Sequence, residues 1–456
     1  MPVPAFDVLA DFEARGLVQD TTDRAALARL LASPPVTVYH GIDPTADSLH
    51  VGHLIGVLAL RRFQLAGHRP IALTGGATGM IGDPGGRSEE RNLLDSTTLG
   101  TNLAAIEGQL RRLLFFEGGG VDGDGVVGDD VRPGERPGAL LVDNAAWTAG
   151  LNLLAFLRDV GKHVTVNQMM AKESVRSRLE GTYGISFTEF SYMLLQANDY
   201  LWLHDHHSCD LQVGGSDQWG NITAGVDLVR RRRGDHVHGL TWPLLTRVDG
   251  TKFGKSQGDN IWLDPAQTSP YAFFQHWMQT GDADLGRYLL QLTLLQVTEV
   301  DEVVAAHTEA PGRRTGQRRL AFEVTALVHG ADQAVAAQAA AAILFGTVPD
   351  DIPYNAYLTL EGEVATTVVT PARLTEGVDL AGLLAETGLA TSLSDARRSL
   401  DQGGIYINGQ RVDQRAGPLT PTSLRLGRWI ILRRGKRHHH LIRVSPEEVD
   451  TRAPGR

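Results

Sequence analysis

Short apolar runs alternate with longer stretches of helical periodicity through about the first 260 residues of the chain. The runs are PVTVYHGI, RPIALTGG, GALLVDNA and CDLQVGG. Apolar runs of strand length that alternate with helical patterns are typical of βαβ units and a parallel sheet. We therefore predict an α/β domain with a doubly wound parallel sheet over residues 1–265.

The pattern changes towards the C-terminus. Residues 266–348 keep helical periodicity, with alanine-rich stretches such as ADQAVAAQAAAAILF, and predict an α-helical domain. Residues 349–370 begin with prolines that interrupt this periodicity, and we interpret them as a linker. Residues 118–138 are rich in Gly, Asp and Pro, can bury little apolar surface, and predict a flexible insertion within the first domain.

Composition excludes several classes of protein. Hydrophobic residues make up 42% of the chain and charged residues 21%, as in globular proteins. The N-terminus shows no export signal, and runs such as LIGVLAL are far shorter than the roughly 20 residues of a membrane-spanning helix. Cys209 is the single cysteine, which excludes an intramolecular disulfide and a thiolate-rich metal site. We expect a soluble, cytoplasmic protein.

Positive charge is concentrated in one region. Residues 371–443 contain 12 Lys and Arg against 6 Asp and Glu, whereas the whole chain has a net charge of -10. The rest of the chain therefore carries -16. A basic module on an acidic body predicts contact with a polyanion through that module alone. We assign residues 371–445 to a small basic domain and 446–456 to a tail.

The stretch HGIDPTADSLHVGHL follows the first long strand pattern. Asp47 or Ser48 is a candidate N-cap for a helix that begins near Leu49, which places His50 and His53 in its first turn. Imidazole groups at a helix N-terminus, beside unpaired backbone N–H groups, suit a bound phosphate. A helix cap with incidental histidines and a metal site are the alternatives that these residues leave open.

A second motif, DGTKFGKSQGDNIWL, places Lys252 and Lys255 three residues apart in a glycine-rich loop, followed by Ser256. Two flexible ammonium groups on such a loop suit the neutralisation of a charge that moves during a reaction, such as departing pyrophosphate. A solvated loop is the alternative for this motif taken alone.

The pair HVGH and KFGKS closely matches the HIGH and KMSKS signatures of class I aminoacyl-tRNA synthetases. The blocks between them, GGATGMIGDP, FLRDVGKH, SFTEFSYMLLQANDY and GGSDQWGNITAG, make residues 37–296 resemble bacterial tyrosyl-tRNA synthetases. The resemblance implies a Rossmann-like catalytic domain, a helical domain that faces the anticodon arm, and a small α+β RNA-binding domain. It also implies the activation of L-tyrosine by ATP and its transfer to tRNA(Tyr).

The resemblance assigns roles to residues that handle ATP. The implied catalytic residues are Thr45, His50, His53, Arg87, Arg91, Lys252, Lys255 and Ser256. The implied ATP-binding residues are Gly41, Asp43, His50, Gly52, His53, Gly215, Asp217, Gln218 and Lys255. Arg87 departs from the lysine that is frequent at its position, and His40 stands where better-known relatives carry a cysteine or another small residue beside the ribose.

The resemblance also implies a tyrosine site formed by Tyr39, Thr78, Asp83, Asn144, Tyr192, Gln196, Asp199 and Gln218. The spacing of Tyr192, Gln196 and Asp199 independently places them on one helical face. Asp199 and Tyr39 are expected to hold the phenolic hydroxyl, and tyrosyl-tRNA synthetases are themselves the known example of the resulting discrimination against phenylalanine. Trp147 is expected to pack in the core.

The C-terminal segment VDLAGLLAETGLATSLSDARRSLDQGGIYINGQRV resembles a small RNA-binding fold known from a ribosomal protein. The implied tRNA-binding residues are Lys172, Glu173, Arg397, Arg398, Arg411, Arg433, Arg434, Lys436 and Arg437. The expected partners are L-tyrosine, ATP and tRNA(Tyr), with a second copy of the chain in a homodimer. Mg²⁺ is expected to be held mainly by the phosphates of ATP, since no metal-binding side-chain cluster is visible.

Three rival interpretations of the function were compared with this one. A tryptophanyl-tRNA synthetase shares the signatures, but Tyr39, Asp199 and the terminal RNA module favour tyrosine. A non-catalytic RNA-binding relative is disfavoured by the intact motifs around His50 and Lys252. A small adenylyltransferase with an HxGH element does not account for the length of the chain or for the second lysine motif.

Overall fold

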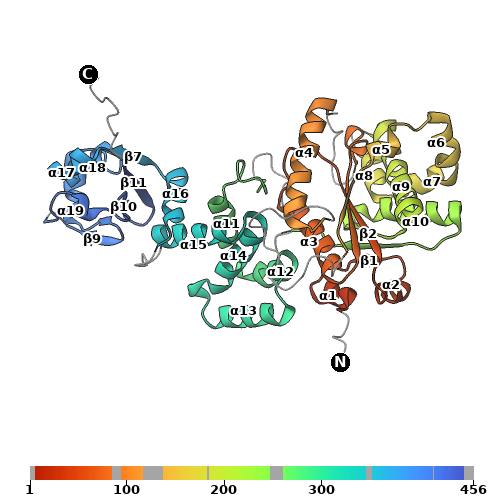
Figure 1. Cartoon of the computed structure of the whole chain (residues 1–456), viewed down its shortest axis with the longest axis horizontal. Coiled ribbons are helices and arrows are strands. Elements are labelled where there is room, and N and C mark those ends of the chain that lie inside the picture. The colour runs from red at the N-terminus through yellow and green to blue at the C-terminus, as the bar shows by residue number, and fades with distance from the viewer. Residues whose placement is uncertain are drawn as a thin grey trace, which may run out of the picture. The chain divides into compact units, whose positions relative to one another are not determined.

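The structure, a computed structural model, describes residues 6–84, 94–116, 137–181, 184–246, 260–345, 352–413 and 415–445. The chain divides into two compact units (Figure 1). The first unit comprises Met1–Ser269 and His276–Gly330, and the second comprises Pro270–Gln275 and Ala331–Arg456. Helix α11, Pro270–Met278, contributes residues to both units.

A six-stranded sheet forms the centre of the first unit, in the order β1-β6-β5-β2-β3-β4. Its strands are β1 Asp20–Thr21, β2 Thr37–Ile42, β3 Arg69–Thr74, β4 Leu140–Asp143, β5 Cys209–Gly215 and β6 His238–Trp242. Strands β2 to β6 pair in parallel and the short β1 pairs antiparallel with β6. The four apolar runs correspond to β2, β3, β4 and β5, so the predicted α/β fold is confirmed.

Helices cover both faces of this sheet. Helices α3 and α4 lie against one face, and α9 and α10 lie against the other (Figure 1). The helices of the sheet region are α1 Val8–Ala14, α2 Arg24–Leu31, α3 Val51–Leu65, α4 Ser96–Leu113, α5 Ala145–Thr148, α6 Leu153–Asp159, α7 Val166–Met170, α8 Glu173–Leu179, α9 Phe187–His207 and α10 Trp219–Arg233. Short 3-10 turns are η1 Thr78–Met80, η2 Gly161–His163 and η3 Ser216–Gln218.

The helical region that follows also packs into the first unit. It contains α12 Asp282–Leu292, α13 Val297–Glu309, η4 Pro311–Arg313 and α14 Thr315–His329. The buried Arg62 on α3 donates from Nη2 to the carbonyl oxygen of Thr293 at 2.6 Å. A buried guanidinium held by backbone carbonyls in this way connects the sheet layer to the helical region.

The second unit has its own sheet, in the order β7-β11-β10-β8-β9. Its elements are α15 Ala331–Phe345, α16 Tyr354–Glu363, β7 Thr366–Val369, α17 Pro371–Glu376, α18 Leu380–Glu386, α19 Leu393–Asp401, β8 Ile405–Ile407, β9 Gln410–Val412, η5 Pro421–Ser423, β10 Trp429–Arg434 and β11 His438–Val444. Leu383 and Leu384 of α18 and Ile430 and Leu432 of β10 belong to one buried core. This small α+β arrangement agrees with the predicted fold class.

Helix α16 and strand β7 lie within residues 349–370, where the sequence predicted a linker. The ring of Tyr357 on α16 stacks on Trp429 with centroids 5.0 Å apart, and Trp429 Nε1 donates to Glu361 Oε1 at 2.6 Å. These contacts attach the segment to β10. The run TTVV carries a β-branched strand signal, which the interpretation of the whole segment as a linker did not use.

The predicted insertion at 118–138 lies outside the described residues except for its last two positions, and the predicted tail at 446–456 lies wholly outside them. Within the described ranges, no helix combines the length and the apolar character that crossing a membrane would require.

Candidate active site

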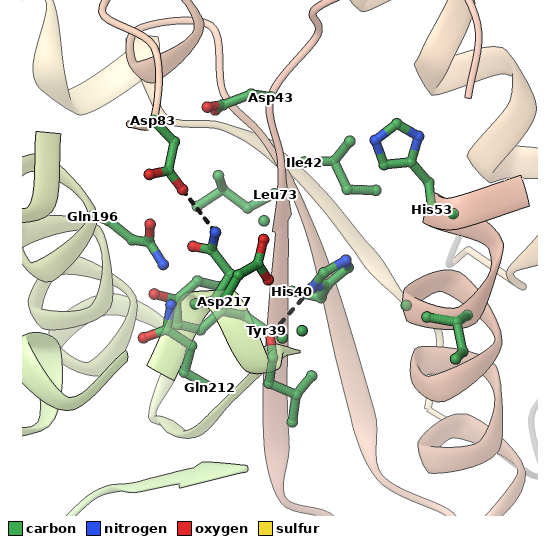
Figure 2. Close-up of a pocket in the computed structure, with 18 of the residues that line it drawn as sticks. Tyr39, His40, Ile42, Asp43, His53, Leu73, Asp83, Gln196, Gln212 and Asp217 are labelled. Atoms are coloured by element: carbon green, nitrogen blue, oxygen red, sulfur yellow. Dashed lines mark hydrogen bonds between the residues drawn. The ribbon is translucent and has the colours of Figure 1, made fainter. Parts of the chain in front are cut away.

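A cavity of about 250 Å³ lies at the carboxyl ends of β2 and β5. From this pair of neighbours the strand order runs outward through β3 and β4 on one side and through β6 on the other. In doubly wound sheets, ligands bind where the strand order reverses in this way. Figure 2 shows Tyr39, Asp43, Asp83, Gln196 and Asp217 around this hollow.

Most of the residues that the sequence assigned to tyrosine and ATP line this cavity. They are Tyr39, Gly41, Asp43, Thr45, Gly52, His53, Thr78, Asp83, Tyr192, Gln196, Asp199, Gly215, Asp217 and Gln218. A side chain at position 215 is disfavoured, because a Cβ atom on Gly215 would lie 2.7 Å from Asp217 Oδ1. The structure therefore brings residues from four separated blocks of sequence to one place.

The buried carboxylate of Asp199 accepts two hydrogen bonds. Asn144 Nδ2 donates to Oδ2 at 2.9 Å and Trp147 Nε1 donates to Oδ1 at 2.8 Å. Burial raises the pKa of Asp199 to about 7, and these two hydrogen bonds oppose that rise. Asp199 thus changes charge near neutral pH, and its ionised form is a strong acceptor.

The hydroxyl of Tyr39 lies in the same cavity wall. It is buried and makes no hydrogen bond to any described residue. Burial and the charge of Asp199 hold the pKa of Tyr39 well above its usual range, so this phenol keeps its proton. Buried polar groups normally have partners. A ligand hydroxyl that donates to Asp199 and accepts from Tyr39 would satisfy both.

Two further carboxylates, Asp43 and Asp83, line the cavity and are held by neutral polar groups. Tyr192 OH donates to Asp43 Oδ2 at 2.8 Å, and Thr78 Oγ1 donates to Asp43 Oδ1 at 2.7 Å. Gln218 Nε2 donates to Asp83 Oδ2 at 2.7 Å. Carboxylates and amide oxygens held in place by such bonds suit a ligand ammonium group.

Helix α3 begins differently from the sequence prediction. The N-cap is His50, and neither Asp47 nor Ser48 has this role. His50 Nδ1 accepts from the backbone N–H of Gly52 at 3.0 Å, and His53 Nδ1 accepts from the backbone N–H of His50 at 3.2 Å. The reciprocal capping pattern usually involves Ser or Thr with Glu or Gln, so histidines in these positions gave no recognisable capping signal.

The capping bonds fix which ring nitrogen carries the proton. Because both Nδ1 atoms accept, the neutral rings of His50 and His53 carry their protons on Nε2. The rings stack with centroids 3.9 Å apart, and burial lowers the pKa of His50. His53 lines the cavity, whereas His50 lies beside it at the helix N-terminus. The pair therefore presents neutral N–H donors of the kind that bind phosphate.

The segment that follows KFGKS lies beside HVGH. Val51 donates its N–H to the carbonyl oxygen of Ile261 at 3.0 Å, and Leu263 donates to that of Leu49 at 2.8 Å. The ring of Trp262 also contacts His50, with centroids 6.1 Å apart. The end of the second motif is thereby tied to the start of the first. The predicted residues Arg87, Arg91, Lys252, Lys255 and Ser256 lie outside the described residues.

His40 lines the cavity and is fixed by its surroundings. Its Nδ1 is 3.1 Å from the carbonyl oxygen of Val213, so Nδ1 carries the proton and donates. Burial lowers the pKa of His40 to about 4, which keeps the ring neutral. A Cβ atom on Gly56 would lie 2.3 Å from His40 Nε2. The absence of a side chain at Gly56 therefore makes room for the larger residue at position 40.

Three residues that contribute to the site were not assigned to it from the sequence. Trp147 was expected only to pack in the core, yet it donates to Asp199. Asn221 Nδ2 lies 3.1 Å from Gln196 Oε1. Gln212 lines the cavity with its Oε1 buried and unpaired among the described residues. Asn221 was visible within the block GGSDQWGN, whereas Trp147 and Gln212 depend on contacts that only the fold creates.

Some of the residues predicted to bind tRNA already make hydrogen bonds within the second unit. Arg434 donates twice to Asp395, and Arg411 donates to the carbonyl oxygens of Gly403 and Gln402. The predicted tRNA-binding residues of the second unit whose side chains are exposed are Arg397, Arg398, Arg411, Lys436 and Arg437. The guanidinium of Arg433 lies 3.9 Å from the ring centre of Tyr406. Several of these charges are thus already engaged in holding the domain together.

In the first unit, Lys172 Nζ donates to Thr223 Oγ1 at 2.7 Å, and burial lowers the pKa of Lys172. Glu173 is the first residue of α8. In the ranges that the structure describes, no group of three or more His, Cys, Asp or Glu side chains is arranged to hold a metal ion.

Comparison with known proteins identifies two families along the chain. Residues 32–346 match the family described as tRNA synthetases class I (W and Y). Residues 362–442 match the tyrosine–tRNA ligase SYY-like C-terminal domain. Together the two matches cover most of both compact units.

Curated relatives match over nearly the whole chain. The tyrosine–tRNA ligase of Opitutus terrae is 48% identical over 438 residues, which are 96% of this chain and 99% of the relative. That of Geobacillus stearothermophilus is 47% identical over 442 residues, 96% of this chain and 100% of the relative. A C-terminally truncated mitochondrial tyrosyl-tRNA synthetase from Aspergillus nidulans superposes with a TM-score of 0.65 at 33% identity, covering 73% of this chain and 92% of that one. The chain belongs to the tyrosine–tRNA ligase family of class I tRNA synthetases.

Proposed function

We propose that this protein activates L-tyrosine with ATP and transfers it to the 3'-terminal adenosine of tRNA(Tyr). The observation that carries the proposal is that one cavity beside the N-terminus of α3 is lined by the buried Asp199 carboxylate and by Tyr39, whose hydroxyl has no hydrogen-bond partner among the described residues. Asp199 and Tyr39 suit a phenolic hydroxyl, and the N-terminus of α3 suits the phosphates of ATP.

In the first step the carboxylate of tyrosine attacks the α-phosphorus of ATP, and the bond to the β-phosphate breaks to release pyrophosphate. The substrate supplies the nucleophile, so the protein contributes position and charge stabilisation. Asp83, Tyr192, Gln196 and Gln218 hold the tyrosine ammonium and carboxylate, with Thr78 and Asn144 supporting the pocket. Asp217 and Gly215 receive the ribose. His40 fills the wall beside the ribose, where its neutral ring offers Nε2 as an acceptor.

Several groups stabilise the negative charge that grows on the departing pyrophosphate. Thr45 and His50 bind the γ-phosphate as the α-phosphorus becomes five-coordinate, and such contacts raise the rate when they are stronger in the transition state. The cationic residues that close over the pyrophosphate are Arg87, Arg91, Lys252 and Lys255, with Ser256. Mg²⁺ enters with ATP and is held mainly by the phosphates.

In the second step the terminal ribose hydroxyl of tRNA(Tyr) attacks the acyl carbon and releases AMP. We assign residues 1–265 to catalysis, 266–348 to the anticodon arm and 371–445 to RNA binding. Lys436 and Arg437 are exposed on the turn between β10 and β11, which favours them as phosphate contacts. We also assign the protein to the cytoplasm.

We further propose that the chain forms a homodimer through the surface of α6, α7 and the start of α9. Several large apolar side chains are exposed on these elements, and exposed apolar surface of this extent favours an interaction site. Leu153 is 68% exposed, Leu154 75% and Phe187 78%. The assembly is measured by analytical ultracentrifugation, in which Leu154→Glu should shift dimer to monomer.

Tyrosine-dependent exchange between pyrophosphate and ATP, measured without tRNA, tests the first step. Phenylalanine and tryptophan are assayed in parallel, with Asp199→Ala as the control variant. We expect exchange with tyrosine and its loss in the variant. Exchange with tryptophan instead would assign the cavity to the other amino acid of this family, and no exchange with any of the three would favour an RNA-binding role without catalysis.

A further inference from the structure

Three aromatic rings form a continuous stack behind the Asp199 carboxylate. The ring of Trp147 lies on Trp202 with centroids 4.0 Å apart and an interplanar angle of 10°. Trp202 in turn lies on His206, with centroids 4.2 Å apart and an angle of 14°. The stack runs from the indole that donates to Asp199 to the exposed ring of His206.

Helix α9 supplies two of the three rings and Asp199 as well. Trp202 and His206 are four residues apart and therefore neighbours on the helix surface. His206 Nδ1 is 2.8 Å from the carbonyl oxygen of Trp202, so Nδ1 donates and the bond fixes the orientation of the imidazole ring. The stack is consequently anchored to the same long helix that carries the carboxylate.

Trp147 lies on a much shorter helix than α9. Helix α5 spans only Ala145–Thr148, and its N-cap Asn144 makes no capping hydrogen bond with its side chain. Asn144 instead uses its side chain to donate to Asp199 and Thr78. One turn of helix does not fix an indole ring by itself, so the position of Nε1 depends on what the ring packs against.

We propose that Trp202, supported by His206, is a positioning residue for tyrosine recognition, because it holds the Trp147 indole at the angle from which Nε1 donates to Asp199. The inference rests on the proposed function of the cavity. A directional hydrogen bond weakens steeply when its angle is lost. Removing the stack should therefore weaken the acceptor for the phenolic hydroxyl and leave the rest of the tyrosine site in place.

The charge environment of Asp199 allows this role to be observed directly. The groups that face the carboxylate are Asp43 and Asp143, which raise its pKa, together with Asn144 and Trp147, which lower it, and the neutral Tyr39. When the Trp147 bond weakens, the pKa of Asp199 must move further up. The pH midpoint of kcat/KM for tyrosine should then move to higher pH, an effect that a loss of general stability does not produce.

The experiment compares Trp202→Leu and Trp202→Phe in pyrophosphate exchange with tyrosine and with phenylalanine. We expect Trp202→Leu to lower kcat/KM for tyrosine by about 3-fold to 10-fold at neutral pH, as for a weakened hydrogen bond to a charged group. The value for phenylalanine should hardly change, and KM for ATP should stay at the wild-type level. Trp202→Phe keeps a stacking ring and should restore most of the discrimination.

Phe190→Leu is the matched control, because Phe190 lies on α9 and packs against the same core without joining the stack. It should leave the tyrosine-to-phenylalanine ratio and the pH midpoint unchanged. If Trp202→Leu does not fold, His206→Ala at the exposed end should lower the ratio by about twofold or more. An unchanged ratio and midpoint in an active, folded stack variant would overturn the inference, whereas an inactive wild-type protein would overturn the proposed function instead.

Discussion

Replacing Trp147 by phenylalanine isolates one hydrogen bond in the tyrosine pocket. The substitution keeps a ring against Trp202 but removes the N–H that donates to Asp199 Oδ1 at 2.8 Å. A hydrogen bond to a charged group is worth about 1.5–3 kcal/mol, and one pKa unit corresponds to about 1.4 kcal/mol. The pKa of Asp199, about 7 in the wild type, should therefore rise by roughly one to two units.

Only the ionised carboxylate of Asp199 is a strong acceptor for the phenolic hydroxyl, so a higher pKa should lower activity at neutral pH. At pH 7.5 a carboxyl group of pKa 7 is about three-quarters ionised. A rise of one to two units leaves about a quarter to about 3% ionised. We thus expect kcat/KM for tyrosine to fall by about 3-fold to 25-fold at pH 7.5 and to recover as the pH rises above about 9.

The assay is pyrophosphate exchange with tyrosine from pH 6 to 9.5, with circular dichroism at each pH as a check on folding. Phenylalanine has no hydroxyl that could donate a hydrogen bond to Asp199, so the pH midpoint of its kcat/KM should hardly shift. A variant whose midpoint coincides with that of the wild type would show that the pKa of Asp199 does not depend on the indole N–H.

Three further sets of substitutions test other parts of the site and the second unit. His50→Asn keeps an N-cap side chain but removes the Nε2 donor, so thermal unfolding should stay close to wild type while kcat falls by about 10²-fold; His50→Ala should also lose about 1 kcal/mol of stability. Gly56→Ala should be destabilised, because its Cβ would lie 2.3 Å from His40 Nε2, and adding His40→Ala should restore the melting temperature, with a double-mutant cycle showing whether the two changes are coupled. Lys436→Ala with Arg437→Ala should leave pyrophosphate exchange unchanged and lower the salt dependence of tRNA binding by a slope of about two in filter-binding titrations.

The sequence predicted strands from short runs rich in apolar residues. PVTVYHGI and CDLQVGG identify β2 and β5 although each contains polar residues, because strands covered by helices on both faces are enriched in apolar side chains. Strand β6 was not predicted, since His238, Gly239 and Thr241 interrupt its pattern. Its place depends on pairing with β5, which is a tertiary contact.

For the site, the motifs identified most of the residues that line the cavity but not how they are held there. The role of Trp147 could not be predicted, because its partner Asp199 is 52 residues away along the chain. Arg434 illustrates the opposite error. It counts as a basic residue in the sequence, yet in the fold it donates to Asp395 and holds the pKa of that carboxyl well below its usual range. Charge counts locate a basic domain without showing which charges are already paired.

Charging of tRNA(Tyr) with labelled amino acids in the presence of ATP and Mg²⁺ tests both steps of the proposed reaction together. We expect tyrosine to become attached to the 3'-terminal adenosine, phenylalanine and tryptophan to remain unattached, and Asp199→Ala to lose the attachment of tyrosine. Attachment of tryptophan, or formation of the adenylate without any transfer to tRNA(Tyr), would contradict the proposed function.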